Sequence, residues 1–250
     1  LNSPLSDYYT ALKNTNKKDL TVREVLCHNA GLKTFIPFFV DAVDKKSLPG
    51  SLFSTVKSPR NPVKLKDRLY VNLNYQFRDS TISNTPKNGY QYMEPGLYMF
   101  PAFQDTILNT ILNSELLPTK NYAYSDLGFI LLKFAVEEIT QKQLDEYCKE
   151  TFYKKLGMNN TDFLGAERLN AKYIIPSNID KLYRKTEIKG CVHDPAAALL
   201  GGVAGHAGLF STADDLAKIS EMYLNKGTYG GETYFSPETV DVFTRKNDTY

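Results

Sequence analysis

The chain has 250 residues, of which 42% are hydrophobic and 12% aromatic, and its formal net charge is +2. This length and composition are typical of one large globular domain or two small ones with a substantial core. A near-neutral charge without a basic block argues against a nucleic-acid partner, and no apolar run approaches the roughly 18 residues of a membrane span.

The termini and the cysteines add little about cellular context. Leu1 is not an initiator methionine and no signal peptide follows it, so we expect the numbering to describe an excised piece of a longer protein. The three cysteines, Cys27, Cys148 and Cys191, are widely spaced, and an odd count gives no disulfide framework. The absence of internal repeats and low-complexity linkers favours a single domain over residues 1–250.

The first half of the chain predicts one short helix and a few strands. Thr21 to Glu24 form a capping-box pattern, so a helix begins there and is expected to end by Gly31. Residues 45–64 are rich in turn formers. Apolar and polar residues then alternate over 69–77, which is the clearest strand signal, and a second strand is expected near 90–92 or 97–100.

The second half predicts mainly helices. Apolar residues at helical spacing indicate helices over about 103–114 and 126–140, followed by a third that ends at Gly157. Together with the strands, these helices predict a helix-dominated α+β fold with one or two short hairpins.

Two further helices carry capping signals near the end of the chain. Residues 211–215 cap a helix that Gly227 ends, and Ser236-Pro237 place a cap and a first-turn proline before the last helix. The helix after residue 215 is expected to bury one stripe of apolar side chains, namely Leu216, Ile219, Met222 and Tyr223.

The most informative motif is Tyr124-Ser125-Asp126, which stands at the start of the helix predicted over 126–140. A tyrosine at a helix N-terminus, followed two residues later by a short amide or acid, resembles the Tyr-x-Asn element of the serine β-lactamase and penicillin-binding-protein family. In that family the tyrosine is a general base or acid, and the third residue hydrogen-bonds the substrate and the catalytic lysine.

Three longer segments resemble the same family in the same order. They are residues 20–32 (LTVREVLCHNAGL), 152–163 (FYKKLGMNNTDF) and 190–217 (GCVHDPAAALLGGVAGHAGLFSTADDLA). Residues 32–39 (LKTFIPFF) and the Tyr-Ser-Asp variant are most similar to one class C-like branch. That branch is the serine-hydrolase domain fused after family 3 glycoside hydrolases in bacteria of the Bacteroides group.

The resemblance implies that the chain is the middle of a β-lactamase/DD-peptidase-like domain. It would hold mainly the helical part and lack most of the central sheet. The family's Ser-x-x-Lys nucleophile would precede residues 20–32, and its late Lys-Thr-Gly or His-x-Gly strand would follow residue 250. We therefore expect the chain to be inactive by itself.

Ser54 to Lys57 form the one Ser-x-x-Lys sequence in the chain, and we interpret them as a coincidence. The chemistry needs both side chains on one helical face, so that the amine can take the hydroxyl proton. Ser58-Pro59 disfavours a helix here, and the motif lies after residues 20–32, which is the wrong order for the family.

Tyr124 and Asp126 are the predicted catalytic residues, each with a structural alternative. Tyr124 in isolation would be a core aromatic, and as a base it would need a lowered pKa, which the absent lysine usually supplies. Asp126 replaces the family's asparagine and can accept but not donate a hydrogen bond, which would change substrate preference. Its alternative role is a first-turn acid favoured by the helix dipole.

Cys191, His193-Asp194 and His206 match no standard metal spacing, so structural roles are expected, with the histidine rings bonded to backbone. The glycines over 201–208 predict tight turns beside the active site instead of a phosphate cradle. No cofactor and no metal are expected.

By resemblance, the intact protein is a serine hydrolase that forms an acyl-enzyme on a peptide, amide or ester, including peptidoglycan-derived substrates. The alternative is a non-catalytic accessory or interaction module of the neighbouring glycosidase. The family implies export to the periplasm or cell envelope. Apolar faces left uncovered by the missing sheet predict a homodimer. An unrelated helical protein with coincidental motifs is the third alternative.

Overall fold

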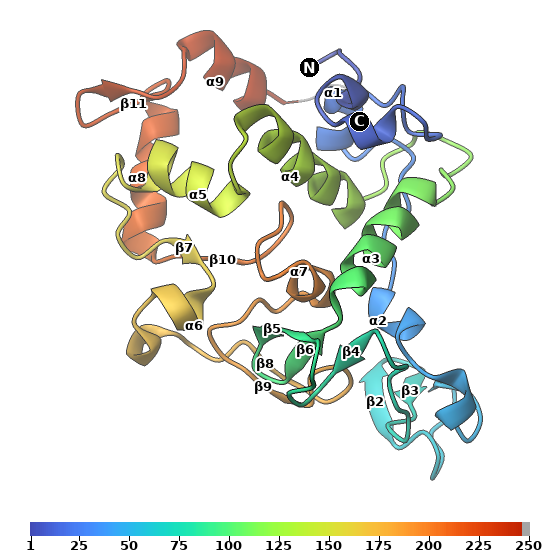
Figure 1. Cartoon of the computed structure of the whole chain (residues 1–250). Helices are drawn as coiled ribbons and strands as arrows, with labels where there is room; N and C mark the ends of the chain where they lie inside the picture. The colour runs from blue at the N-terminus through green and yellow to red at the C-terminus, as the bar shows by residue number, and fades with distance from the viewer. Residues whose placement is uncertain (247–250) are drawn as a thin grey trace.

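The structure is a computed structural model that describes residues 1–246. It is an α+β fold in which helices predominate and the strands are short, as the sequence predicts (Figure 1). The α-helices are α1 (Val22–Leu26), α2 (Phe38–Asp41), α3 (Pro101–Asn113), α4 (Asp126–Thr140), α5 (Leu144–Cys148), α6 (Gly165–Arg168), α7 (Pro195–Leu199), α8 (Ala213–Leu224) and α9 (Pro237–Thr244).

The strands of the described residues form five small antiparallel sheets. Two sheets have three strands, in the orders β1-β3-β2 and β4-β6-β5, and the others are the pairs β7–β10, β8–β9 and β11–β12. The sequence predicts fewer hairpins, because pairs of two to four residues are too short to show an alternating pattern. The bounds are β1 (Phe53–Ser54), β2 (Val63–Lys66), β3 (Leu69–Val71), β4 (Ile82–Ser83), β5 (Gln91–Glu94), β6 (Leu97–Met99), β7 (Asp162–Phe163), β8 (Asn178–Asp180), β9 (Thr186–Ile188), β10 (Leu209–Phe210), β11 (Thr228–Tyr229) and β12 (Glu232–Thr233).

The strand predicted over 69–77 is mostly wrong. Only β3 (Leu69–Val71) forms, although Val71 and Tyr75 are both buried as the alternation requires. The reason is local, because the buried Asn72 side chain accepts a hydrogen bond from the backbone N–H of Asn74 at 2.9 Å. This Asx turn replaces the ladder bonds of a strand. The strand predicted near 90–92 or 97–100 is confirmed, and both places form strands, β5 and β6, which pair with each other.

Helices α3 and α4 supply much of the core, and α4 begins and ends where the sequence predicts. The core face of α4 includes Leu127, Ile130 and Leu131, each at most 1% exposed. Helix α1 approaches α4 so closely that a Cβ at Gly128 would lie 2.9 Å from Cγ1 of Val25. A glycine here therefore lets the segment that holds α1 lie against the start of α4.

The capping predictions are confirmed. Thr21 and Glu24 form the capping box of α1, and Thr212 and Ser236 accept N-cap hydrogen bonds at the starts of α8 and α9. Gly157 and Gly227 both have positive φ angles after their helices.

The apolar stripe predicted for α8 is wrong at two positions. Met222 is fully buried, but Leu216 is 49% and Tyr223 41% exposed. Asp215 is buried instead, because its carboxylate accepts hydrogen bonds from the Asn160 backbone and the Thr161 hydroxyl. A polar anchor therefore sets the rotation of this helix, which hydrophobic spacing does not reveal.

Candidate functional site

Tyr124 and Asp126 lie at the N-terminus of α4 (Figure 1), and the backbone of Ser125 between them is extended. Ser125 is the N-cap residue, but its side chain makes no cap hydrogen bond. Its buried hydroxyl instead donates to the Lys33 carbonyl at 2.7 Å. The start of α4 is thus fixed to the segment that follows α1.

His28 is the second anchor of this segment. Its Nδ1 accepts the backbone N–H of Ser125 at 3.2 Å, and its carbonyl accepts that of Ala123 at 2.8 Å. The ring lies 4.5 Å from the Tyr124 ring and 5.4 Å from the Phe129 ring, centroid to centroid. Accepting through Nδ1 requires a neutral ring with its proton on Nε2.

The electrostatics around His28 agree with a neutral ring. Burial lowers the pKa of His28, while the negative charge of Asp126 opposes this shift. His28 also holds a positive φ of 56°, an uncommon conformation for a residue other than glycine. The sequence marks His28 only as part of a family segment, so its anchoring role was missed.

Tyr124 and Asp126 are brought together. Tyr124 is 57% exposed, and its pKa is raised, first by the Asp126 charge, then by burial and by a hydrogen bond to the Asp126 carboxylate. A raised pKa makes the phenol a hydrogen-bond donor instead of a base. Asp126 is also the first residue of α4, where the helix dipole favours an acid, so its position fits the structural alternative.

Asp194 and His206 form a second pair near Tyr124. Nε2 of His206 lies 2.9 Å from an Asp194 oxygen that also accepts the backbone N–H of Ala197 at 2.7 Å. Burial raises the pKa of Asp194, but these donors outweigh it, and the net pKa is lowered. The Asp194 charge also contributes to the raised pKa of Tyr124.

The expectation that the histidine rings bond to backbone is wrong for His206. Its side chain is only 3% exposed, its Nε2 contacts a carboxylate, and its Nδ1 has no hydrogen-bond partner. His193, in contrast, is exposed to solvent. Within residues 1–246, no group of three or more His, Cys, Asp or Glu side chains is placed to hold a metal ion.

The glycine-rich segment 201–208 carries His206 past α4 in tight turns. Gly201, Gly202 and Gly208 have positive φ angles, which confirms the predicted turns. Gly205 is required for a different reason, because a Cβ there would lie 2.1 Å from the Phe129 carbonyl oxygen. The segment can therefore lie directly against the α4 backbone only with glycine at this position.

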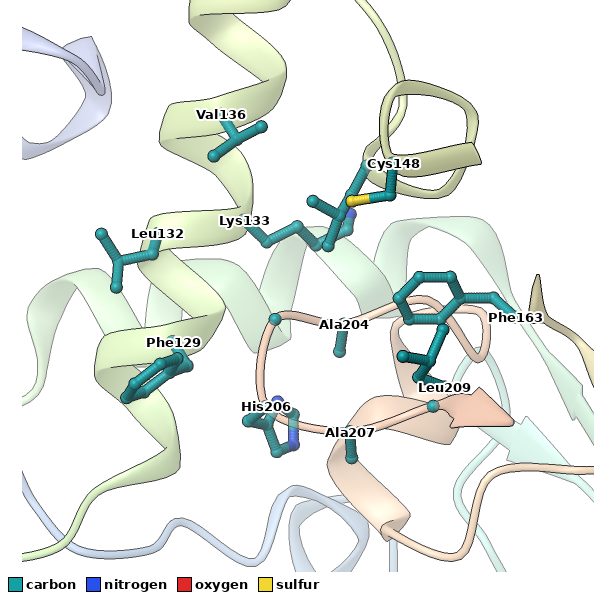
Figure 2. A pocket seen from close by; sticks show the side chains of 13 residues that line it. Phe129, Leu132, Lys133, Val136, Cys148, Phe163, Ala204, His206, Ala207 and Leu209 are labelled. Carbon is teal, nitrogen blue, oxygen red and sulfur yellow. The ribbon is translucent and has the colours of Figure 1, made fainter. Parts of the chain in front are cut away.

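A cleft of about 520 Å³ lies between α4, α5 and this segment (Figure 2). Its walls are mostly apolar, with Phe129, Leu132 and Val136 from α4. Lys133 reaches from α4 toward Cys148 and is only 7% exposed. Its ammonium pairs with Glu137 at 3.1 Å and lies 4.5 Å from the Phe134 ring centroid.

The Ser54–Lys57 motif has no catalytic geometry. Ser54 lies in β1, and its hydroxyl donates to the Val56 carbonyl at 2.8 Å. Because no helix forms here, Ser54 and Lys57 do not share a helical face, as expected.

The comparisons with known proteins agree with this fold. The family model described as Beta-lactamase matches residues 1–244. A protein of Escherichia coli K12, provisionally named a D-alanyl-D-alanine carboxypeptidase, is 38% identical over an alignment of 146 residues that covers 52% of this chain and 33% of that protein. The chain spans about a third of the length of the curated relatives that it matches first.

Solved structures show the same fold at low sequence identity. A penicillin-binding-protein homologue from Caulobacter crescentus superposes with a TM-score of 0.52 at 12% identity, covering 98% of this chain and 54% of that one. FmtA from Staphylococcus aureus has a TM-score of 0.51 at 16% identity, covering 96% of this chain and 48% of that one.

The fold is therefore that of the β-lactamases and penicillin-binding proteins. The chain belongs to the β-lactamase family.

Proposed function

We propose that this chain is the tyrosine-bearing part of a serine hydrolase that forms an acyl-enzyme on a peptide, amide or ester. The observation that carries this proposal is the Tyr124–Asp126 pair, fixed at the start of α4 by His28 and Ser125 beside a mostly apolar cleft. The carboxypeptidase name of the curated relatives favours a peptide substrate derived from peptidoglycan.

In this proposal the parent protein supplies a Ser-x-x-Lys helix and a late His-x-Gly or Lys-Thr-Gly strand. The lysine ammonium would offset the negative charges of Asp126 and Asp194, which raise the pKa of Tyr124. Tyr124 would then move protons during acylation, and Asp126 would orient the lysine or the substrate. The chain by itself would be inactive for lack of a nucleophile.

Acylation of the parent protein tests this proposal. The parent would be incubated with a fluorescent penicillin and, separately, with a fluorophosphonate, and the labelling rate would be followed by intact mass. Tyr124→Phe is expected to slow labelling by about 100-fold or more. Tyr122→Phe is the matched control, since Tyr122 is also 57% exposed and lies beside His28, and it should leave the rate within about twofold. Equal rates for both variants would refute the catalytic role of Tyr124.

The isolated chain gives a second readout. We expect no adduct with either reagent, whereas a stoichiometric adduct on Ser54 would overturn the assignment of the nucleophile to the parent. The alternative function is a non-catalytic accessory module, favoured by the acid at position 126. A parent protein that retains Ser-x-x-Lys but never acylates would support that alternative.

The remaining expectations belong to the parent protein. We propose export to the cell envelope and fusion to a family 3 glycoside hydrolase. Within residues 1–246, no helix is long and apolar enough to cross a membrane.

We also propose that the isolated chain self-associates, because it exposes large apolar side chains, including Leu224 at 81% and Ile175 at 82%. A strictly monomeric chain in light scattering would contradict this.

A further inference from the structure

A buried arginine connects the sheet β8–β9 to the Asp194–His206 pair. Arg184 lies in the turn between these strands, and its side chain is 2% exposed. The carboxylate of Asp180 accepts the backbone N–H groups of Leu182, Tyr183 and Arg184 at 2.8 to 2.9 Å. The same carboxylate accepts Nε–H of Arg184 at 3.0 Å, so one acid shapes the turn and orients the guanidinium.

The guanidinium then makes three further hydrogen bonds away from the turn. Nη1 donates to the Glu94 carboxylate at 2.5 Å and to the Val192 carbonyl at 2.6 Å, and Nη2 donates to the His193 carbonyl at 2.6 Å. Four of the five N–H groups of Arg184 are thus used in fixed directions. The planar guanidinium can satisfy four such acceptors, whereas a lysine ammonium has only three donors.

The two carbonyls that Arg184 holds immediately precede the site. Asp194 follows His193 in the chain, caps α7 through the backbone N–H of Ala197, and accepts from Nε2 of His206. Any shift of the 192–193 backbone therefore moves the carboxylate that orients His206. Because Nδ1 of His206 has no partner, Asp194 is the only hydrogen-bond partner of this buried ring within residues 1–246.

We propose that Arg184 is a positioning residue of the candidate site, which acts through the Val192 and His193 carbonyls on Asp194. Asp194 in turn holds His206 in the Nε2–H tautomer and places its own negative charge near Tyr124. The effect on catalysis rests on the proposed function. The effect on the His206 ring does not, and it can be measured without any activity.

Nuclear magnetic resonance of the chain labelled with ¹⁵N-histidine tests the inference. The chain has three histidines, so the spectrum contains signals from three imidazole rings. The neutral ring of His28, whose Nδ1 accepts a hydrogen bond, is an internal reference. Arg184→Lys keeps the charge but cannot reach all four acceptors. We expect His206 to change from one tautomer to a mixture and its Nε2 proton to exchange with water at least about tenfold faster.

Arg168→Lys is the matched control. Arg168 also bridges two buried carboxylates, Asp145 and Asp162, but its hydrogen bonds go to these two acids and not to residues 192–194. It should leave the His206 ring signals unchanged. A His206 ring that is equally unchanged in Arg184→Lys would overturn the inference.

A second variant covers the case in which Arg184→Lys does not fold. Glu94→Gln keeps an acceptor for Nη1 but removes its charge, and Glu94 lies on β5 and is not part of the turn. It should speed exchange of the His206 Nε2 proton by about threefold. An unchanged exchange rate of this proton in Glu94→Gln would also overturn the inference. If the His206 ring responds but the parent protein never acylates, the proposed function fails while the positioning role stands.

Discussion

The two sides of the candidate site are held in place by different physical means. On the Tyr124 side, the anchors are neutral, namely the His28 ring, the Ser125 hydroxyl and the Lys33 carbonyl. On the Asp194 side, the anchors are charged, from the buried Arg184 to the partly buried Asp194 carboxylate. Removing one member of the charged side should therefore lower the free energy of unfolding more. The stability that the charged side contributes also depends on pH in a different range.

The contrast follows from what each side must orient. A tyrosine at a helix start is positioned once its backbone is fixed, which hydrogen bonds to carbonyl and imidazole groups achieve. A buried imidazole has two nitrogens and a choice of tautomer, which a neighbouring carboxylate settles. Breaking a buried charge network leaves its other members without compensation, so the largest effects are expected there.

Arg184→Met should give the largest loss of stability. It would leave Glu94 and Asp180, at 7% and 11% side-chain exposure, without their cation. The expected loss in the free energy of unfolding is about 3–5 kcal/mol. Arg168→Met also leaves Asp145 without its cation, but it should lose only about 1–2 kcal/mol, because the Arg168 side chain is 32% exposed and Asp162 keeps its ion pair with Lys149. Urea unfolding at pH 7 measures both, and equal losses would show that the Arg184 network is no more sensitive than the more exposed Arg168 cluster.

Gly205→Ala should give the second largest effect, because it acts where the two sides meet. The new Cβ would lie 2.1 Å from the Phe129 carbonyl, so the backbone has to move, at about 2–3 kcal/mol. Gly165→Ala is the matched control, since its Cβ would meet only the Phe210 ring at 3.0 Å, which can tilt. It should cost about 1 kcal/mol or less. A Gly205→Ala variant as stable as Gly165→Ala would contradict the close approach.

The Tyr124 side was more predictable from the sequence than the Asp194 side. Helix α4 and its first residues follow from local patterns, since caps and apolar spacing act within a few positions. The role of Arg184 depends on groups up to 90 residues away in the chain, and no local pattern reports such a contact. The same reason explains the errors on α8 and on residues 69–77, where the buried polar groups Asp215 and Asn72 decide the local structure.

Ser125→Ala should weaken the neutral side only moderately. Its hydroxyl donates to the Lys33 carbonyl, and losing that bond costs about 1 kcal/mol. Ser220→Ala is the control, because the exposed Ser220 hydroxyl bonds only within α8 and its loss should be within about 0.5 kcal/mol. Thermal unfolding of both variants measures the difference, and a Ser125→Ala variant with no loss would show that His28 alone fixes this segment.

The smallest effect is a pH dependence that separates the two sides. Burial lowers the pKa of His28 below its ordinary value of about 6.5, and Asp126 opposes this shift. The unfolded chain therefore binds a proton at a higher pH than the folded chain does. His28 makes stability fall as pH drops below about 6.5, and the loss levels off once the pH is below the folded pKa.

Asp194 acts in a lower range, because its donors hold its pKa below the ordinary value in spite of burial. Its contribution is complete above about 3.9 and is lost as pH falls through the folded pKa. His28→Asn should remove only the pH dependence that His28 causes. Asparagine tolerates the positive φ and can still accept the Ser125 N–H, so the anchor itself is kept. Urea unfolding at pH 7 and 5.5 should show a flatter pH dependence for His28→Asn. The exposed control His193→Asn should keep the slope of the unaltered chain, and a His28→Asn variant that also kept it would place the titrating group elsewhere.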